Sequence, residues 1–303
     1  MIKVRGISNE MIKRLEDLGY EDINQVAVET PKHLADLLEV KEAVASRIIS
    51  ICRNAFYPVF KVASEYAKEL EKIQKIPTGS KNLDELLSGG IPCRNLIEFA
   101  GEYGVGKTQT CFTLAVMAQK VNGSAIFIDT ENTIRPKRIE EIAKARKVEN
   151  ALDNIYIINS ITSEELILTI RKLRDVIDKF NETHENKVKL IIVDSLIAPF
   201  RSDFIGRGEL AERQQKLGWT LQELQRIAWQ KDLAVVFTNQ VIATPYVFGK
   251  GFIPTGGHVL AHKAQYRFLI RRGKGNIRVF RVIDAPDLIE SEVLVKVTEK
   301  GIE

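Results

Sequence analysis

Short uninterrupted runs of apolar residues alternate with longer segments of helical periodicity over most of the chain after residue 94. Runs such as Leu190–Val193 predict strands that are buried on both faces. Segments such as Thr162–Phe180 carry apolar residues at every third or fourth position, which predicts helices with one buried face. Strands that alternate with helices are typical of a parallel sheet covered on both sides. We therefore predict an α/β core with a mostly parallel central sheet.

The same pattern sets the approximate bounds of the expected elements. The expected strands are Asn95–Ala100, Ala125–Asp129, Ile155–Ile158, Leu190–Asp194, Leu233–Thr238, Gln265–Arg271, Arg278–Asp284 and Val293–Thr298. The expected helices are Thr108–Lys120, Pro136–Arg146, Thr162–Phe180 and Glu209–Lys231. Only turns separate the last three strands, so we expect the sheet to end in an antiparallel edge. Residues 241–258 contain glycines and follow neither period, so we expect a loop there.

The N-terminal residues follow helical spacing alone. Ile7, Met11 and Leu15 recur at that spacing, and Gly19 stands where a helix-ending glycine is expected. Further helices are expected over Asp22–Val28, from Pro31, and over Lys41–Ala55. We expect a helical domain at 1–57, a linker with a helix at 58–76, and the α/β core at 77–303. Short helices with glycine-containing turns resemble paired helix-hairpin-helix units, which contact nucleic-acid backbones, although a plain helical docking module fits the pattern equally well.

Composition and charge restrict the function without deciding it. The 303 residues carry a formal net charge of +4, which permits nucleic-acid binding without requiring it. The three cysteines are far apart and have no metal-ligand spacing, which is typical of a reducing, cytoplasmic setting. No apolar run approaches the roughly 20 residues of a membrane span, and the N-terminus lacks the apolar segment of a signal peptide. We therefore expect no membrane partner.

The residues Gly101–Thr108 match the pattern G-x-x-x-x-G-K-[ST], and they lie between an expected strand and an expected helix. The glycines allow successive backbone N–H groups to turn toward one anion, and the helix N-terminus adds a partial positive charge. Lys107 is expected to reach the β- and γ-phosphates of a nucleotide, and the Thr108 hydroxyl to bind Mg²⁺. The stretch predicts a phosphate-binding loop.

Polar residues follow three other expected strands, where a parallel sheet binds its ligands. Asp194 follows four apolar residues and is a candidate metal-binding carboxylate, although a strand-end helix cap is the alternative. Glu131 is a candidate general base for water, and Gln240 a candidate sensor of the γ-phosphate. Each of these two residues, taken alone, is also typical of a solvated strand end.

Basic residues cluster in two expected loops on the same side of the sheet. Arg201, Arg207 and Arg213 surround two glycines, and residues 241–258 hold Lys250 together with Gly256, Gly257 and His258. Arginines on glycine loops suit contacts with the phosphates of a polynucleotide strand. A solvated basic face is the alternative.

Taken together, these residues resemble the RecA-class strand-exchange recombinases, and among them the archaeal RadA group. The similarity runs from Gly6 to Glu303. It rests on motifs in a fixed order, namely Gly101–Gln109, Ile128–Glu131, Leu190–Ser195, Arg213–Leu217, Thr238–Val241, Gly256–His258 and Asp284–Pro286. The resemblance implies a RecA-type P-loop ATPase core and a small all-α helix-hairpin-helix N-terminal domain.

The resemblance also implies ATP and Mg²⁺ as cofactors. The implied nucleotide contacts are Gly101, Glu102, Tyr103, Gly104, Val105, Gly106, Lys107, Thr108, Gln109, Arg138, Asp194, Asp284 and Pro286. Among them, Thr108 and Asp194 hold the metal, and Arg138 packs on the adenine. Asp284 and Pro286 correspond to a cap that a neighbouring subunit places over ATP, with a monovalent cation such as K⁺ near Asp284. The implied catalytic residues are Lys107, Glu131 and Gln240, and Gln240 links the γ-phosphate to the second DNA-binding loop.

The DNA and subunit contacts follow from the same resemblance. Arg201, Arg207 and Arg213 match the first DNA-binding loop, while Lys250, Gly256 and Gly257 fall in the second. Phe60 and Ala63 match an F-x-x-A polymerisation motif, in which both side chains of one protomer fill pockets on the sheet of the next.

The implied activity is that of a DNA-dependent ATPase that forms helical filaments or rings on single-stranded DNA. It would pair this DNA with homologous duplex and exchange strands in recombination and in repair of DNA damage, associated with the nucleoid. Asn132 and Ile134 depart from the family's Gly and Phe beside the catalytic glutamate, and Thr244 replaces an expected charged residue. A recombinase paralogue or mediator that regulates another filament is therefore the alternative, and recombination mediators are expected partners.

Overall fold

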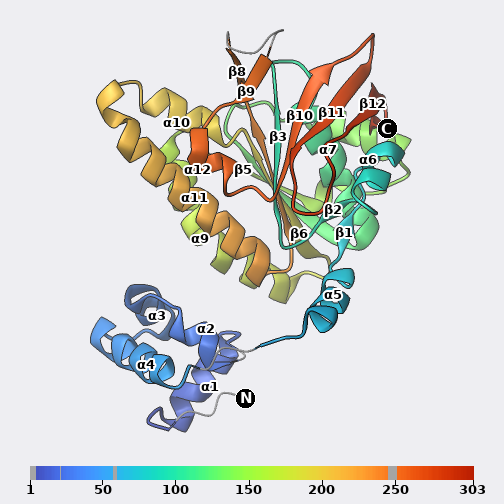
Figure 1. Ribbon diagram of the computed structural model, residues 1–303. Coiled ribbons are helices and arrows are strands. Elements are labelled where there is room, and N and C mark those ends of the chain that lie inside the picture. The colour runs from blue at the N-terminus through green and yellow to red at the C-terminus, as the bar shows by residue number, and fades with distance from the viewer. Residues whose placement is uncertain (1–4, 21, 57–59, 245–250) are drawn as a thin grey trace. The chain divides into compact units, whose positions relative to one another are not determined.

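The computed structural model describes residues 5–20, 22–56, 60–244 and 251–303 (Figure 1). The chain divides into two compact units, Met1–Glu71 and Lys72–Glu303. In the part of the chain that is described, no helix is both long and apolar enough to cross a bilayer.

The N-terminal unit is a small helical bundle. Its helices are α1 (Asn9–Asp17), α2 (Ile23–Ala27), α3 (Pro31–Leu38), α4 (Glu42–Asn54) and α5 (Ala63–Glu71). Side chains start three of them: Ser8, Asp22 and Thr30 each accept a hydrogen bond from a backbone N–H of the first turn. Gly19 has a φ of +85° just after α1, as its predicted role requires. Leu15, Leu34, Leu38 and Ile49 are among the buried residues of this bundle, whereas α5 has no buried residue.

The second unit contains a nine-stranded sheet in the order β13-β12-β11-β10-β3-β7-β6-β4-β5. Its strands are β3 (Leu96–Gly101), β4 (Gly123–Asp129), β5 (Ile155–Asn159), β6 (Lys187–Asp194), β7 (Ala234–Asn239), β10 (Tyr266–Arg272), β11 (Ile277–Asp284), β12 (Glu292–Thr298) and β13 (Gly301–Ile302). Strands β3 to β7 and β10 run parallel, while β11 to β13 pair antiparallel. The predicted parallel sheet with an antiparallel edge is therefore confirmed.

Helices cover both faces of this sheet. They are α6 (Lys81–Leu86), α7 (Lys107–Met117), α8 (Pro136–Ala145), α9 (Ser163–Thr183), α10 (Ile197–Asp203), α11 (Leu210–Gln230) and α12 (Gly257–Ala261). Figure 1 shows α9 and α11 on one face and α7 on the other. Alternate residues of each strand enter different cores, because side chains in a strand point to opposite faces. In β4, for example, Phe127 packs into the core with α7, and Ile126 and Ile128 pack into the core with α9 and α11.

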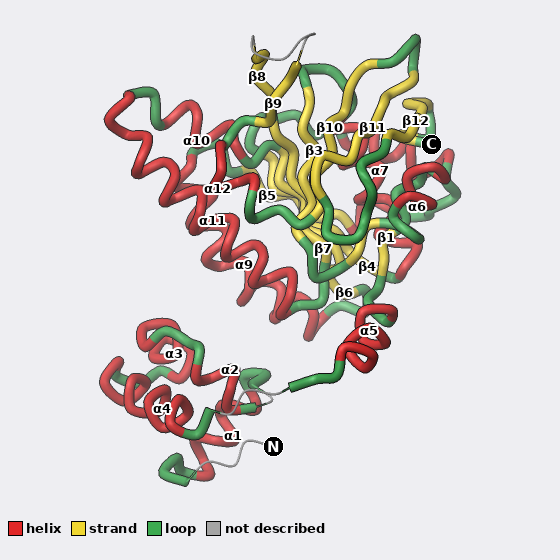
Figure 2. The backbone as a smooth tube through the Cα atoms, viewed as in Figure 1, coloured by secondary structure: helices red, strands yellow, loops and turns green. Residues whose placement is uncertain are grey.

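Two segments that the sequence assigned to loops contain regular structure. Residues 241–258 include the antiparallel ribbon β8 (Val241–Thr244) and β9 (Gly251–Pro254), followed by the start of α12 (Figure 2). The first basic segment contains α10. The loop predictions were wrong here because a two-stranded ribbon is defined by cross-strand pairing, which leaves little period in four-residue strands. A further ribbon pairs β1 (Lys75–Ile76) with β2 (Ile91–Pro92).

Candidate nucleotide-binding site

The glycine-rich loop between β3 and α7 has the backbone that its sequence predicts. Gly104 and Gly106 have φ angles of +72° and +100°, in the left-handed region that favours glycine. A Cβ atom on Gly101 would lie 2.6 Å from the Ile270 carbonyl oxygen, so only glycine fits there. Helix α7 begins at Lys107, and its first-turn N–H groups have no carbonyl partner within the helix. The loop therefore presents backbone donors at a helix N-terminus, which is an anion-binding arrangement.

The side chain of Lys107 folds back over this loop. Its ammonium donates to the carbonyl oxygens of Gly101, at 2.8 Å, and Glu102, at 2.9 Å. Burial lowers the pKa of Lys107, while the negative charges of Asp194 and Glu131 act in the opposite direction. The ammonium is thus partly desolvated and held where a phosphate oxygen would compete well for it.

Asp194 joins the phosphate loop to the end of β6. Its Oδ2 accepts a hydrogen bond from the Thr108 hydroxyl at 2.7 Å, and its Oδ1 accepts one from the Thr238 hydroxyl. The residue is only 5% exposed, and this burial raises the pKa of Asp194 although both hydroxyls oppose the shift. Hydroxyl and carboxylate oxygens are ligands that Mg²⁺ accepts. These two side chains fit a Mg²⁺ ion that phosphate and water oxygens also coordinate, which is how proteins commonly bind it. No group of three or more His, Cys, Asp or Glu residues that could hold a metal occurs among the described residues.

Glu131 lies in a turn that Asp129 organises. The Asp129 carboxylate accepts hydrogen bonds from the backbone N–H groups of Glu131, Thr133 and Ile134, at 3.0 to 3.2 Å. Asn132 has a φ of +54°, and asparagine is one of the few residues that tolerates this region. The Asn132 departure is therefore compatible with the turn, to which Ile134 contributes its backbone N–H. The Ser195 hydroxyl donates to Glu131 Oε1 at 3.1 Å, which points the carboxylate toward the end of β6.

Gln240 follows β7, which lies between β3 and β6 in the sheet. Its side-chain oxygen accepts a hydrogen bond from the Arg201 guanidinium at 2.6 Å. Arg201 belongs to the last turn of α10, so this arginine lies on a helix and not on the predicted loop. A polar group at the nucleotide end of the sheet is therefore bonded directly to the first basic segment.

The predicted residues Arg138 and Asp284 lie in two different settings. Arg138, on α8, donates to the Gln109 side chain at 2.9 Å and to the carbonyl oxygen of Thr298 at 2.6 Å, so it is held beside α7. Asp284 is paired with Arg267, at the opposite end of the outer strands from Gly101, which pairs with Ile270. Within one chain, the structure therefore does not bring Asp284, or Pro286 after it, to the phosphate loop.

Of the predicted DNA contacts, Arg213 lies in the first turn of α11, and Gly256 and Gly257 precede and begin α12 with φ angles of +102° and +65°. Arg207 belongs to a 3₁₀ turn whose backbone alone is described, and Lys250 lies outside the described residues.

Two arginines that the sequence did not single out contact the phosphate loop. Arg278 Nε donates to the Val105 carbonyl oxygen at 2.9 Å, and Arg272 donates to that of Gly104 at 3.2 Å. Both come from the hairpin between β10 and β11, far away in the sequence. Their only signal was a cluster of positive charge around that turn, which is also typical of an exposed hairpin.

The site consists of a strand, a glycine loop and a helix that carry a lysine and a threonine, with the carboxylate of Asp194 from β6 beside them. This combination defines a P-loop protein. The large mixed sheet, with β7 between the loop strand and the Asp194 strand, fits a RecA-type core. The sequence profile of the Rad51 family matches residues 69–303, and the chain belongs to this family. Membership gives a role as a RecA-like recombinase and ATPase in DNA recombination, and members of the family bind DNA, use ATP with Mg²⁺ and self-associate into filaments.

Proposed function

We propose that this protein is a recombinase of the archaeal RadA type. It polymerises on single-stranded DNA, hydrolyses ATP in response to DNA, and catalyses homologous pairing and strand exchange. The observation that carries this proposal is the hydrogen bond between Arg201 and Gln240. It connects a group at the nucleotide end of the sheet to a basic helix, which is the connection that ATP-controlled DNA binding requires.

The phosphate loop and its neighbours would hold the nucleotide. Lys107 exchanges its two carbonyl partners for β- and γ-phosphate oxygens, and Arg138 lies against the adenine. Thr108 and Asp194 would hold Mg²⁺, which would neutralise charge on the phosphates. Glu131, oriented by Ser195, accepts a hydrogen bond from the attacking water and aligns it with the γ-phosphorus.

The basic segments would hold the DNA. Arg201, Arg207 and Arg213 contact the phosphates of one strand, and Lys250, Gly256 and Gly257 of the predicted second DNA-binding segment contact it as well. Gln240 changes partners when the γ-phosphate is present, which alters the position of Arg201 and of the ribbon that follows Gln240. ATP thereby favours the DNA-binding arrangement, because it binds that arrangement more tightly.

Self-assembly would use two surfaces. Phe60 is 84% exposed, and α5, which begins at Ala63, has no buried residue, so this segment is suited to cover another protomer. β5 is the last strand of the central sheet and carries the half-exposed Ile157, which offers both backbone groups and apolar surface to such a segment. Asp284 and Pro286 of a second protomer complete the nucleotide site. Residues 1–57 form a helix-hairpin-helix domain that contacts DNA backbone, joined to the core by the linker 58–76.

The test is electron microscopy and a strand-exchange assay with the purified protein, single-stranded DNA, Mg²⁺ and a slowly hydrolysed ATP analogue. The wild-type protein is expected to form filaments and exchange strands without another protein. Lys107→Ala is expected to abolish both, with loss of most nucleotide affinity, because it removes the charged phosphate contact. Filaments of Lys107→Ala at wild-type nucleotide concentration would contradict the site. Wild-type filaments that never exchange strands would indicate a paralogue or mediator.

A further inference from the structure

A buried carboxylate lies in the middle of β3, three residues before the phosphate loop. Glu98 is 0% exposed. Its Oε2 accepts a hydrogen bond from Arg267 Nε at 2.6 Å, and its Oε1 accepts one from Asn239 Nδ2 at 2.6 Å. Burial raises the pKa of Glu98, against the opposing effect of Arg267 and Asn239. Replacing both members of a buried ion pair by apolar residues is often neutral or stabilising, so the Glu98–Arg267 pair calls for an explanation other than stability.

The hydrogen bonds of Asn239 continue to the base of the β8–β9 ribbon. Its Nδ2 also donates to the Thr255 carbonyl oxygen at 2.8 Å, and its Oδ1 accepts from the Thr255 hydroxyl at 2.7 Å. Thr255 in turn donates to the Gln240 carbonyl oxygen, from its backbone N–H at 2.9 Å and from its hydroxyl at 3.1 Å. Gln240 precedes β8 and Thr255 follows β9. The chain of bonds from Glu98 therefore reaches both strands at the base of the ribbon.

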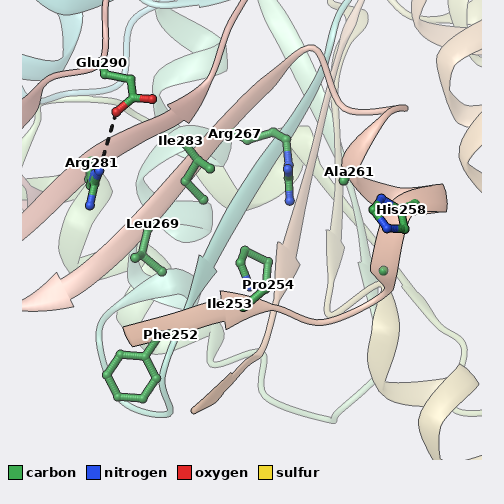
Figure 3. A pocket seen from close by; sticks show the side chains of 11 residues that line it. Phe252, Ile253, Pro254, His258, Ala261, Arg267, Leu269, Arg281, Ile283 and Glu290 are labelled. Atoms are coloured by element: carbon green, nitrogen blue, oxygen red, sulfur yellow. Dashed lines mark ion pairs between the residues drawn. The ribbon is translucent and has the colours of Figure 1, made fainter. Parts of the chain in front are cut away.

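Arg267 lies near the base of the same ribbon. It lines a cavity of about 470 Å³ together with Phe252 and Pro254 of β9 and His258 of α12. Figure 3 shows the Arg267 guanidinium between the outer strands and the base of the ribbon. The ion pair thus lies at the junction of the ribbon with β3, β7 and β10.

The ribbon needs such an anchor because it is a separate two-stranded sheet. Two strands alone are marginally stable in water, so their position must be set by contacts at their base. Hydrophobic contacts would allow the base to slide, whereas hydrogen bonds to a fixed carboxylate specify one arrangement.

We infer that Glu98 is a positioning residue, which holds the base of the β8–β9 ribbon through Asn239 and Thr255 and so transmits the nucleotide state of Gln240 to DNA affinity. The inference rests on the proposed function, in which this ribbon contacts DNA and Gln240 senses the γ-phosphate. Glu98 itself touches neither ligand. Because Glu98 fixes the base of the ribbon, a change at Gln240 moves the ribbon in one defined way.

The experiment compares single-stranded DNA affinity with and without a slowly hydrolysed ATP analogue, in the full-length protein. Thr255→Val removes the ribbon-side hydroxyl with little change of shape, and Glu98→Gln removes the charge inside the core. For each variant, we divide the dissociation constant for DNA without the analogue by the constant with it. This ratio should fall about five- to tenfold, which corresponds to the loss of a hydrogen bond worth about 1 kcal/mol or more. Nucleotide affinity and nucleotide-free DNA affinity are expected to remain within about twofold of wild type.

Leu173→Ala serves as the control, since Leu173 is buried in α9 and its loss lowers stability without touching the ribbon. It is expected to lower the melting temperature and to keep the wild-type ratio. Hydrogen exchange should also quicken over the peptide that spans residues 236–256 in Thr255→Val and Glu98→Gln, but not in Leu173→Ala.

An unchanged ratio in Thr255→Val would overturn the inference, even if Glu98→Gln failed to fold, and so would an equal fall in the control. Wild-type protein whose DNA affinity does not respond to the ATP analogue would instead overturn the proposed function, and with it the coupling assigned to Glu98.

Discussion

Asp194 shows how a single functional residue opposes the stability of the fold that holds it. The hydrophobic residues before it draw β6 into the core, and they take the carboxylate with them until only 5% of the residue is exposed. Hydrogen bonds from Thr108 and Thr238 compensate only in part, so burial still raises the pKa of Asp194. Without a metal ion beside it, the ionised carboxylate is a net cost to the folded state, since burial outweighs Lys107 and both hydroxyls.

The substitution Asp194→Asn is therefore expected to stabilise the protein in the absence of nucleotide and metal. A raised folded pKa means that the native carboxylate favours the proton, so its contribution to stability falls as pH rises through that pKa. The melting temperature of Asp194→Asn should exceed that of wild type at pH 7 to 8 by a few degrees, at roughly 2–4 °C for each kcal/mol. The difference should disappear as pH falls toward the ordinary aspartate value of about 3.9.

Calorimetry over this pH range measures the change in melting temperature, and ATPase assays measure the change in activity. ATP hydrolysis by Asp194→Asn should fall at least about a hundredfold, because the Mg²⁺-binding carboxylate is lost. A variant that is less stable than wild type at pH 8 would show that the hydrogen bonds of the charged form outweigh its desolvation.

At the scale of single elements, α5 and the residues before it have an amphipathic sequence but no buried face. Phe60, Val62, Tyr66 and Leu70 are all substantially exposed. An amphipathic helix is normally stabilised by burial of its apolar side, so this one has the character of an interface element.

Phe60→Glu is expected to abolish self-assembly and leave the monomer folded. The side chain contributes almost nothing to the core, so the melting temperature of the monomer should stay within about 1 °C. Analytical ultracentrifugation with ATP and Mg²⁺ measures the assembly. Val28→Glu is a matched control, because Val28 is also exposed, at 67%, and lies outside the predicted motif. Equal loss of assembly in both variants would show a general effect of added charge, not a specific Phe60 contact.

The sequence predicts elements well where one segment determines its own structure. The apolar run before Asp194, the glycines of the phosphate loop and the capping residues of α1 to α3 act locally, and their elements were predicted correctly. The β8–β9 ribbon and α10 were not predicted, because their conformations depend on hydrogen bonds between residues distant in the sequence. Examples are the bonds from Thr255 to Asn239 and from Arg201 to Gln240. Arg272 and Arg278 were missed for the same reason, since their acceptors lie about 170 residues earlier.

For the whole molecule, the position of Asp284 decides how many chains a complete site needs. Strand β11 runs antiparallel to β10, so Asp284, at the end of β11, pairs with Arg267 near the start of β10. The phosphate loop of the same chain begins at the other end of these strands, where Gly101 pairs with Ile270. If Asp284 and Pro286 cover ATP, they must therefore cover the ATP of another copy, which makes the interface head-to-tail.

A mixing experiment tests this arrangement. Lys107→Ala chains have a damaged phosphate loop and an intact cap. Asp284→Ala chains have an intact phosphate loop and a damaged cap. Each variant alone is expected to show little DNA-stimulated ATPase activity. An equal mixture should regain activity above the mean of its components, up to about a quarter of the wild-type rate per site, since an intact loop meets an intact cap only where an Asp284→Ala chain lies beside a Lys107→Ala chain. A mixture no more active than the mean of its components would show that each site is completed within one chain.

The two arginine contacts from the β10–β11 hairpin make the phosphate loop dependent on residues that follow it by about 170 positions. The loop and its lysine therefore leave the ribosome well before Arg272 and Arg278. β10 must also insert beside β3 before either guanidinium can reach its carbonyl. A nascent chain therefore cannot complete the hydrogen bonds around its phosphate loop until translation has passed residue 278, which delays the finished loop, and any assembly that depends on it, until then.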